Sequence, residues 1–303
     1  MSDDAAAVRT LLERPPDVLA PVPGTSRVVA ADVEGPADGT PIVLVHGTPD
    51  SRLARHPDAS IAAGLGVRLI AVDRPGFGLT TADPDATPSG FAADVTALLD
   101  HLGIASAQLL AWSAGTIWAL GAAAAAPARV CSVTAVGGLV PFEAFSDPAV
   151  REAAGDARAG MIETAEELGS TVAAAMIAPL LVPDPVTPEA ALEHRAEAGD
   201  TAVSAVPSAD VQMAAAICDA VRAGRAGLVR DVTVQLAPSG VDLGGIAVPV
   251  TLVTGTHDTI CPPAFAQWYA ARLARSAVDI VPDAGHGLLL SHWHDLLARI
   301  MAT

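Results

Sequence analysis

Short apolar runs alternate along most of the chain with segments whose apolar residues recur at helical spacing. The runs are of strand length, rich in β-branched residues and leucine, and several end at Gly, Asp or Pro. Near-continuous apolar runs are typical of parallel strands buried on both faces, and their alternation with helical patterns predicts a sheet covered by helices. The predicted strands are Ile42–Val45, Arg68–Val72, Gln108–Ala111, Val130–Val136, Val250–Thr254 and Val278–Val281. We interpret Ser26–Glu34 as an additional strand at the edge of the same sheet.

The strand patterns fade at about Phe142 and resume at Val248. Between these points, Ala-rich segments carry Glu, Asp and Arg at helical intervals and are interrupted by prolines. A helical insertion between two strands of one sheet explains this change. The sequence therefore predicts a core domain of residues 1–141 and 236–303, and a helical cap of residues 142–235 over the carboxyl ends of the strands.

Composition narrows the classes of function. The chain has 17 basic and 34 acidic residues, a net charge of −17, and every basic residue is arginine. Such a charge repels nucleic acid and anionic membranes, and the absence of lysine excludes Schiff-base chemistry. We find no apolar stretch typical of a membrane span, no signal-peptide pattern, and no cysteine spacing typical of disulfides or zinc. We expect a cytoplasmic monomer or homodimer that binds a small-molecule substrate, with no cofactor, no metal, and no nucleic-acid or membrane partner.

The strongest local pattern is Leu109–Thr116, which passes from a strand into a helix through a turn with Ser113 at its apex. This arrangement is typical of a nucleophile elbow, in which a strained turn presents a hydroxyl above the sheet. The usual G-x-S-x-G pattern has Ala111 in place of its first glycine, which is the smallest possible departure. The alternative is an ordinary serine that caps a helix. The neighbouring Trp112 is a candidate for the substrate pocket.

A serine hydroxyl becomes an effective nucleophile only beside a base that a third group orients. The elbow predicts the chain order serine, acid, histidine. His286 lies in a glycine-flanked loop directly after the last predicted strand, and we predict that it is the base. Asp258, in a turn after the preceding strand, is the predicted acid. Asp283 and Glu143 remain as weaker candidates for the acid.

Acyl transfer also requires hydrogen-bond donors for the developing oxyanion. The loop His46–Pro49 follows the strand Ile42–Val45, where an oxyanion-hole loop is expected. The backbone N–H groups of Thr48 and Ala114 are the predicted donors. His46 is interpreted as a residue that structures this loop and as a second candidate for the pocket, since the chain order disfavours it as the base.

Five motifs stand in the order found in proteins of the α/β-hydrolase fold, which the chain resembles from about Arg27 to Ile300. They are HGTP at His46–Pro49, DRPGFG at Asp73–Gly78, AWSAG at Ala111–Gly115, GTHD at Gly255–Asp258 and GHG at Gly285–Gly287. The resemblance implies an eight-stranded, mostly parallel sheet flanked by helices, with a helical cap inserted after the sixth strand. It does not imply a substrate, because this fold hosts many chemistries.

Departures from the patterns of individual subfamilies narrow the function. Haloalkane dehalogenases and epoxide hydrolases of this fold use an aspartate nucleophile, and here the apex is Ser113. We therefore predict a serine hydrolase of the carboxylic-ester-hydrolase type. Through an acyl-enzyme on Ser113, it would cleave an ester, lactone or thioester of a small to medium, mostly apolar substrate. Two alternatives stay open: biosynthetic acyl transfer or cyclisation on the same triad, and ligand binding with vestigial hydrolysis.

Overall fold

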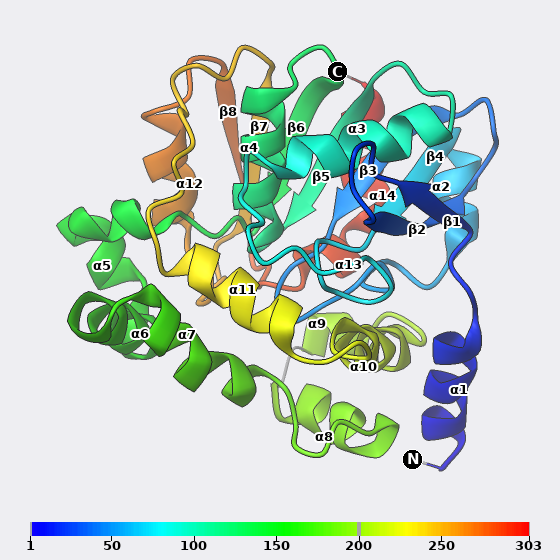
Figure 1. Ribbon diagram of the computed structural model, residues 1–303, viewed down its shortest axis with the longest axis horizontal. Coiled ribbons are helices and arrows are strands. Elements are labelled where there is room, and N and C mark those ends of the chain that lie inside the picture. Colours follow the sequence, from blue (N-terminus) through cyan, green and yellow to red (C-terminus); the bar gives the residue numbers. More distant parts are fainter. Residues whose placement is uncertain (1, 199–200, 303) are drawn as a thin grey trace.

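A sheet with the strand order β1-β2-β4-β3-β5-β6-β7-β8 forms the centre of the molecule (Figure 1), in a computed structural model that describes residues 2–198 and 201–302. The strands from β4 to β8 pair in parallel, and β2 pairs antiparallel with both β1 and β4. The strands are β1 Val18–Pro21, β2 Val28–Glu34, β3 Thr40–Val45, β4 Val67–Val72, β5 Ala107–Trp112, β6 Val130–Val136, β7 Val250–Gly255 and β8 Ser276–Val281. This architecture confirms the predicted α/β-hydrolase fold.

Helices cover both faces of the sheet, which explains why its central strands are apolar along nearly their whole length. In Figure 1, α3 and α4 lie in front of the sheet and α2 and α14 behind it. These helices of the core are α2 Ala59–Gly64, α3 Phe91–His101, α4 Gly115–Ala125, α12 Pro263–Ala270, α13 Leu288–Ser291 and α14 Trp293–Met301. Within the described ranges, no helix combines the length and hydropathy needed to cross a membrane.

Both edges of the sheet differ from what the sequence predicts for them. Ser26–Glu34 was interpreted as an edge strand, and this is wrong: β2 lies between β4 and β1, and β1 forms the edge. The four residues of β1 are too few to give a periodic pattern. At the opposite edge, Val278 and Ile280 of β8 are each 38% exposed, so this apolar run is not a strand buried on both faces.

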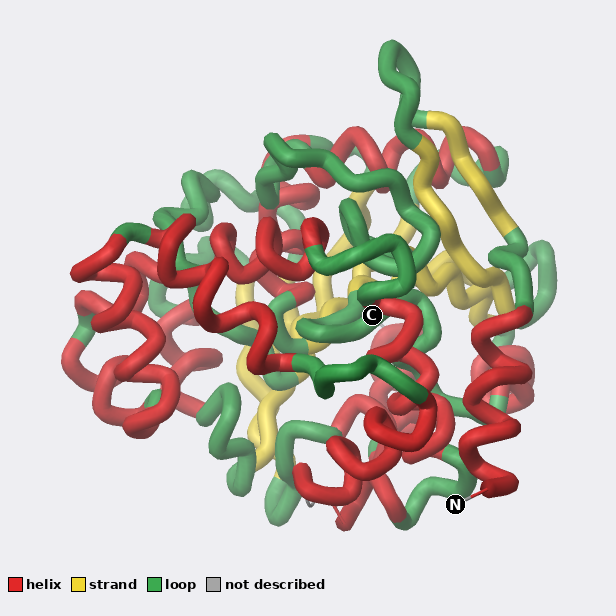
Figure 2. Tube along the Cα trace, turned by 60° about the horizontal axis from the view of Figure 1, so that its bottom comes forward, coloured by secondary structure: helices red, strands yellow, loops and turns green. Residues whose placement is uncertain are grey.

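A helical insertion separates β6 from β7 and lies against one end of the sheet (Figures 1 and 2). The N-terminal helix α1 (Ser2–Glu13) packs on α8 and α10 of this insertion. The elements of the insertion are η1 Phe142–Ser146, α5 Pro148–Ala153, α6 Gly155–Leu168, α7 Ser170–Ile177, η2 Ala178–Leu181, α8 Pro188–Ala198, α9 Thr201–Ser204, α10 Ala209–Ala220 and α11 Ala226–Gln235. The division into a core domain and a separate cap of residues 142–235 stays a prediction.

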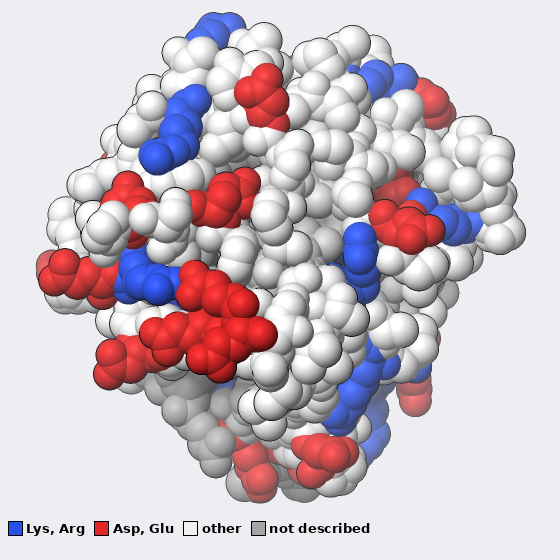
Figure 3. Space-filling model, turned by 60° about the vertical axis from the view of Figure 1, so that its left-hand side comes forward, with Lys and Arg blue, Asp and Glu red and all other residues white. Residues whose placement is uncertain are grey.

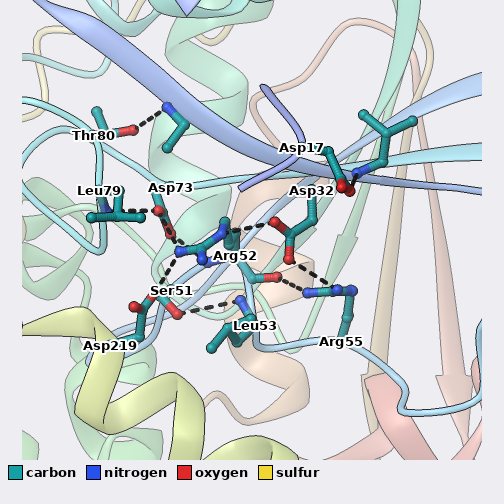
Figure 4. A network of polar contacts seen from close by, with 12 residues as sticks. Asp17, Asp32, Ser51, Arg52, Leu53, Arg55, Asp73, Leu79, Thr80 and Asp219 are labelled. Atoms are coloured by element: carbon teal, nitrogen blue, oxygen red, sulfur yellow. Dashed lines mark hydrogen bonds and ion pairs between the residues drawn. The ribbon is translucent and has the colours of Figure 1, made fainter. Parts of the chain in front are cut away.

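The buried side chain of Arg52 joins the sheet to the insertion (Figure 4). Its Nε donates to Asp32 Oδ1 of β2 at 2.9 Å, and its Nη1 donates to Asp73 Oδ2 at 3.0 Å and to Asp219 Oδ2 of α10 at 2.6 Å. Burial alone would lower the pKa of Arg52, but the carboxylates of Asp73, Asp219 and Asp32 raise it above its ordinary value. The guanidinium therefore stays charged and holds three carboxylates from three different elements together.

Removing this cation should destabilise the fold strongly. In Arg52→Met, three buried carboxylates lose their shared partner, and we expect the free energy of unfolding to fall by about 3–5 kcal/mol, as for other broken buried ion pairs. The matched control is Arg9→Met, which removes the exposed ion pair with Glu189 and should cost about 1 kcal/mol or less. Urea unfolding followed by circular dichroism measures both. Equal losses in the two variants would contradict the anchoring role of Arg52.

Candidate active site

Ser113 lies in a sharp turn between β5 and α4. Its φ of 54° falls in the left-handed region, which a non-glycine residue occupies only when its surroundings enforce it. The Ser113 N–H donates to Val136 O at 3.0 Å, and the Ser113 carbonyl accepts from Leu139 N at 3.0 Å. A Cβ at Gly115 would lie 2.4 Å from Val45 O, so the turn requires glycine there. The backbone of the predicted elbow is thus held in a strained conformation by its neighbours.

Ala111 stands where the elbow pattern usually has its first glycine. It lies in β5, paired with Val45 of β3 and Ala135 of β6, and its side chain is fully buried. The sheet accommodates the methyl group without loss of register at this position. Replacement of the glycine by alanine is therefore compatible with the turn at Ser113.

His286 and Asp258 form a hydrogen-bonded pair at the carboxyl end of the sheet. His286 Nδ1 lies 2.9 Å from Asp258 Oδ2. The other carboxylate oxygen, Oδ1, accepts from Ile260 N at 2.9 Å and from Cys261 N at 2.8 Å, which fixes the buried acid. With Nδ1–H donating to the carboxylate, Nε2 of the imidazole is left to accept a proton. His286 and Ser113 line the same cavity.

The two weaker candidates for the acid face other residues, although Asp283 also lines the cavity. The side chain of Asp283 is 91% exposed and faces His257 Nε2 at 3.9 Å. Glu143 accepts hydrogen bonds from Ser239, at 3.0 Å from its N–H and 2.5 Å from its Oγ. Neither carboxylate contacts His286. The geometry therefore favours Asp258 as the partner of the histidine.

Trp112 and Gly137 shape the surroundings of His286. The Trp112 ring stacks on the imidazole with centroids 5.7 Å apart, and its Nε1 donates to His286 O at 3.1 Å. Trp112, which the sequence suggests as a residue of the substrate pocket, also lines the cavity. A Cβ at Gly137, whose φ is 52°, would lie 3.0 Å from Asp258 Oδ2 and 3.1 Å from His286 Nδ1. The sequence interpretation missed Gly137, although a glycine directly after the strand Val130–Val136 was the available signal.

The amide groups of Thr48 and Ala114 border the cavity beside Ser113. Within the described part of the chain, neither N–H donates to a protein acceptor. The Thr48 hydroxyl donates to Asp231 of α11 and accepts from Arg74 Nη2 and Gln235 Nε2, each at 3.0 Å. These contacts hold the loop after β3 against the insertion and leave its amide available to a ligand.

His46 is not among the residues that line the cavity, and its role in a substrate pocket stays a prediction. It is buried, with Nδ1 2.8 Å from Gly47 O, and its Nε2 accepts from Arg74 N at 3.1 Å. Burial and the charge of Arg74 lower the pKa of His46 well below its ordinary value. A neutral imidazole that bridges the two loops after β3 and β4 agrees with its interpretation as a structural residue.

The cavity has a volume of about 510 Å³, and the insertion contributes charged and polar side chains to it. Polar and apolar residues share the lining, so the cavity does not by itself favour the mostly apolar substrate that the sequence predicts. From the insertion come Arg158 of α6, His194 and Arg195 of α8, Met213 and Ile217 of α10, and Gln235 of α11. Across the described residues, no three His, Cys, Asp or Glu side chains are grouped so that they could hold a metal ion.

Asp50 places a buried carboxyl group close to the nucleophile. A Cβ at Gly47 would lie 3.0 Å from Ser113 Cβ and 3.3 Å from Asp50 Oδ2, so the two side chains flank the same backbone. Burial raises the pKa of Asp50 to about 6, although Arg195, Arg74 and His286 act to lower it. The folded protein therefore holds a proton on Asp50 at a pH where the unfolded chain has released it.

This difference makes stability depend on pH in a defined direction. The proton that Asp50 keeps in the folded state stabilises the fold at low pH. This contribution to the free energy of unfolding is lost as the pH rises from about 4 to about 6. Asp50→Asn has no charge to bury, so its stability relative to the wild type should increase by about 2 kcal/mol between pH 4 and pH 7. Urea unfolding of both proteins across this range measures the difference. A difference in the free energy of unfolding between the two proteins that does not change with pH would show that folding does not shift the pKa of Asp50.

Comparisons with known proteins show the family of the chain. Residues 42–300 match the alpha/beta hydrolase family. The chain is 40% identical over 110 residues to the dihydrolipoyllysine-residue acetyltransferase component of an acetoin cleaving system from Pseudomonas putida, covering 34% of this chain and 28% of that protein. It is 33% identical over 132 residues to an epoxide hydrolase from Caballeronia sordidicola, covering 43% of this chain and 38% of that protein. The chain thus spans well under half the length of these curated relatives.

The fold is also shared with solved structures. The enol-lactonase from Burkholderia xenovorans superposes with a TM-score of 0.63 at 18% identity, covering 94% of this chain and 98% of that one. At this identity the likeness concerns the fold alone. The family match covers most of the chain, and the strand order and the turn at Ser113 accord with it. The chain belongs to the alpha/beta hydrolase family.

Proposed function

We propose that this protein is a serine hydrolase that cleaves a carboxylic ester, lactone or thioester through an acyl-enzyme on Ser113. The observation that carries the proposal is the Asp258–His286 pair, joined at 2.9 Å, on the same cavity as Ser113. A serine, a histidine and a buried acid that orients the histidine are the parts that nucleophilic acyl transfer needs. They follow one another along the chain in the order typical of this fold.

In the first step, His286 Nε2 takes the proton from Ser113 Oγ as the oxygen attacks the carbonyl carbon. The electron pair of the carbonyl double bond moves to its oxygen, and the amides of Thr48 and Ala114 donate to the oxyanion. The Asp258 carboxylate stabilises the imidazolium that forms. When the tetrahedral intermediate collapses, the leaving group takes the proton from His286 and the acyl group stays on Ser113.

In the second step, His286 removes a proton from water, and the hydroxide oxygen attacks the acyl carbon. Collapse releases the carboxylic acid, and the proton returns to Ser113 Oγ. We propose that residues 142–235 act as a cap that limits the access of water to this cavity. Acyl transfer to a substrate hydroxyl or amine would use the same residues, and it differs only in the acceptor of the second step.

Two other activities receive less support. Epoxide hydrolysis in this fold uses an aspartate nucleophile, and Ser113 stands at the apex of the turn, so the partial match to a protein of that name does not change the proposal. A protein that only binds a ligand has no need for an oriented Asp258–His286 pair. Both alternatives predict that Ser113 does not become acylated.

Labelling with a fluorophosphonate and turnover of short p-nitrophenyl esters test the proposal. We expect one label per chain, on Ser113, and multiple turnovers of the ester. In Ser113→Ala, labelling should disappear and kcat should fall roughly 10⁶-fold, as in other serine triads. Labelling that persists in this variant, or that never occurs in the intact protein, would contradict the proposal.

The two aspartates of this region provide a matched pair of variants. Asp258→Asn should lower kcat about 10⁴-fold, because asparagine does not hold the imidazole in the required tautomer. Asp283→Asn changes an exposed side chain and should leave kcat close to that of the wild type. Comparable losses in both variants would contradict the assignment of the acid.

A further inference from the structure

Arg158 of α6 lies on the cavity that contains Ser113, and its charge has no partner there. Among the described residues, it forms no ion pair and no hydrogen bond, and it is only partly exposed. Burial lowers the pKa of its guanidinium. A desolvated cation without a counter-charge is costly to keep in a folded protein. The position of Arg158 therefore needs an explanation outside the stability of the fold.

Arg158 and Ser113 both act on the buried thiol of Cys261, in the loop after β7. The Cys261 thiol is buried beside Asp258, and burial followed by the Asp258 charge raises its pKa. The charge of Arg158 and a hydrogen bond with Ser113 act on the same thiol in the opposite direction. The charge of Arg158 therefore reaches a buried residue of the loop after β7, and both Arg158 and Ser113 line the cavity.

The cavity contains charged groups of both signs beside Ser113. On the side of the loop after β3, the Asp50 carboxyl lies next to the nucleophile, and Arg195 of α8 acts on it electrostatically. Arg158 lines the same cavity, and it forms no ion pair with Asp50, with Asp258, which holds His286, or with the exposed Asp283, which also lines the cavity. An anion would be attracted to Arg158, because no carboxylate of the described residues neutralises its charge.

Arg158 differs from the fully buried arginines of the described chain, which have acidic partners; Arg195, which also lines the cavity, likewise forms no ion pair with a described residue. The chain carries twice as many acidic as basic residues, and acidic side chains gather in a large group on the face shown in Figure 3. The buried arginines Arg52 and Arg74 are both paired with aspartates. With so many acidic residues in the chain, a counter-charge for Arg158 would be expected from the protein itself if the arginine served only the fold.

We propose that Arg158 binds an anionic group of the substrate, a carboxylate or a phosphate, and thereby makes the enzyme selective for anionic acyl compounds. The inference rests on the proposed function for the position of the scissile bond at Ser113. Arginine presents its donors in a planar fork that matches both oxyanions. A cavity of about 510 Å³ has room for an acyl chain that spans from Ser113 to the guanidinium.

Three esters of one chain length test the selectivity. They are mono-p-nitrophenyl adipate, its neutral isostere p-nitrophenyl 6-methylheptanoate, and the p-nitrophenyl ester of 5-phosphonopentanoic acid. The wild type should prefer an anionic ester over the neutral one in kcat/KM. In Arg158→Met, kcat/KM for the anionic ester should fall about 10- to 100-fold, mainly through KM, as expected for a lost charge-assisted hydrogen bond. Hydrolysis of the neutral ester should stay near the wild-type rate.

Two further variants separate charge from structure. Arg158→Lys keeps the charge and should recover part of the preference. Arg151→Met removes an arginine of the neighbouring helix α5 that pairs with Glu166 and should leave all three rates unchanged. The ratio of kcat/KM for the adipate ester to kcat/KM for the phosphonate ester shows whether the site prefers a carboxylate or a phosphate-like group. Equal losses for the neutral and anionic esters in Arg158→Met, or no anionic preference in the wild type, would overturn the inference.

A binding measurement keeps this test independent of turnover. Calorimetric titration measures the affinity for adipate and for 5-phosphonopentanoate. The wild type should bind at least one of these anions, and Arg158→Met should bind it at least tenfold more weakly. Equal binding by both proteins, or no binding of either anion, would overturn the role of Arg158. If the enzyme hydrolyses the neutral ester as efficiently as the anionic esters, this inference is overturned while the proposed function stands. Failure of Ser113 to label would contradict the proposed function alone.

Discussion

The buried ion pair between Arg74 and Asp231 is the contact on which the arrangement of the site depends. Arg74 follows β4, and Asp231 lies in α11 of the insertion, so the pair crosses between the core and the insertion. Asp231 also accepts from the hydroxyl of Thr48 and, at 2.9 Å, from Nε1 of Trp118 in α4. A buried ion pair is a weak source of stability because both charges lose their hydration. Its consequence here is positional: it fixes the Thr48 loop relative to the helix that begins at the elbow.

A second contact of the same kind lies at Arg52, which holds Asp219 of α10 as well as two aspartates of the core. In both contacts the core contributes the arginine and the insertion contributes an aspartate. The insertion is thereby fixed at two points, and the cavity lies between it and the turn at Ser113. The polar lining follows from this arrangement, because α6 and α8 present Arg158 and Arg195 to the same space.

Much of the fold and of the candidate triad could be predicted because each feature has a local signal. Ser113, Asp258 and His286 all stand just after apolar runs of strand length, in an order that the fold prescribes. β1 could not be found, because four residues give no period, and without it β2 was taken for the edge. Asp231 and Arg158 could not be found either. A charged residue in an Ala-rich helix carries no sign of which face is buried until distant elements pack against it.

A crystal structure of the protein after reaction with a fluorophosphonate would test the central claim most directly. The account predicts a covalent bond from Ser113 Oγ to phosphorus, with the phosphoryl oxygen about 2.7–3.1 Å from the amide nitrogens of Thr48 and Ala114. His286 Nε2 should lie within hydrogen-bonding distance of Ser113 Oγ, with the Asp258 contact retained. An adduct on another residue, or a phosphoryl oxygen that points away from both amides, would contradict the account.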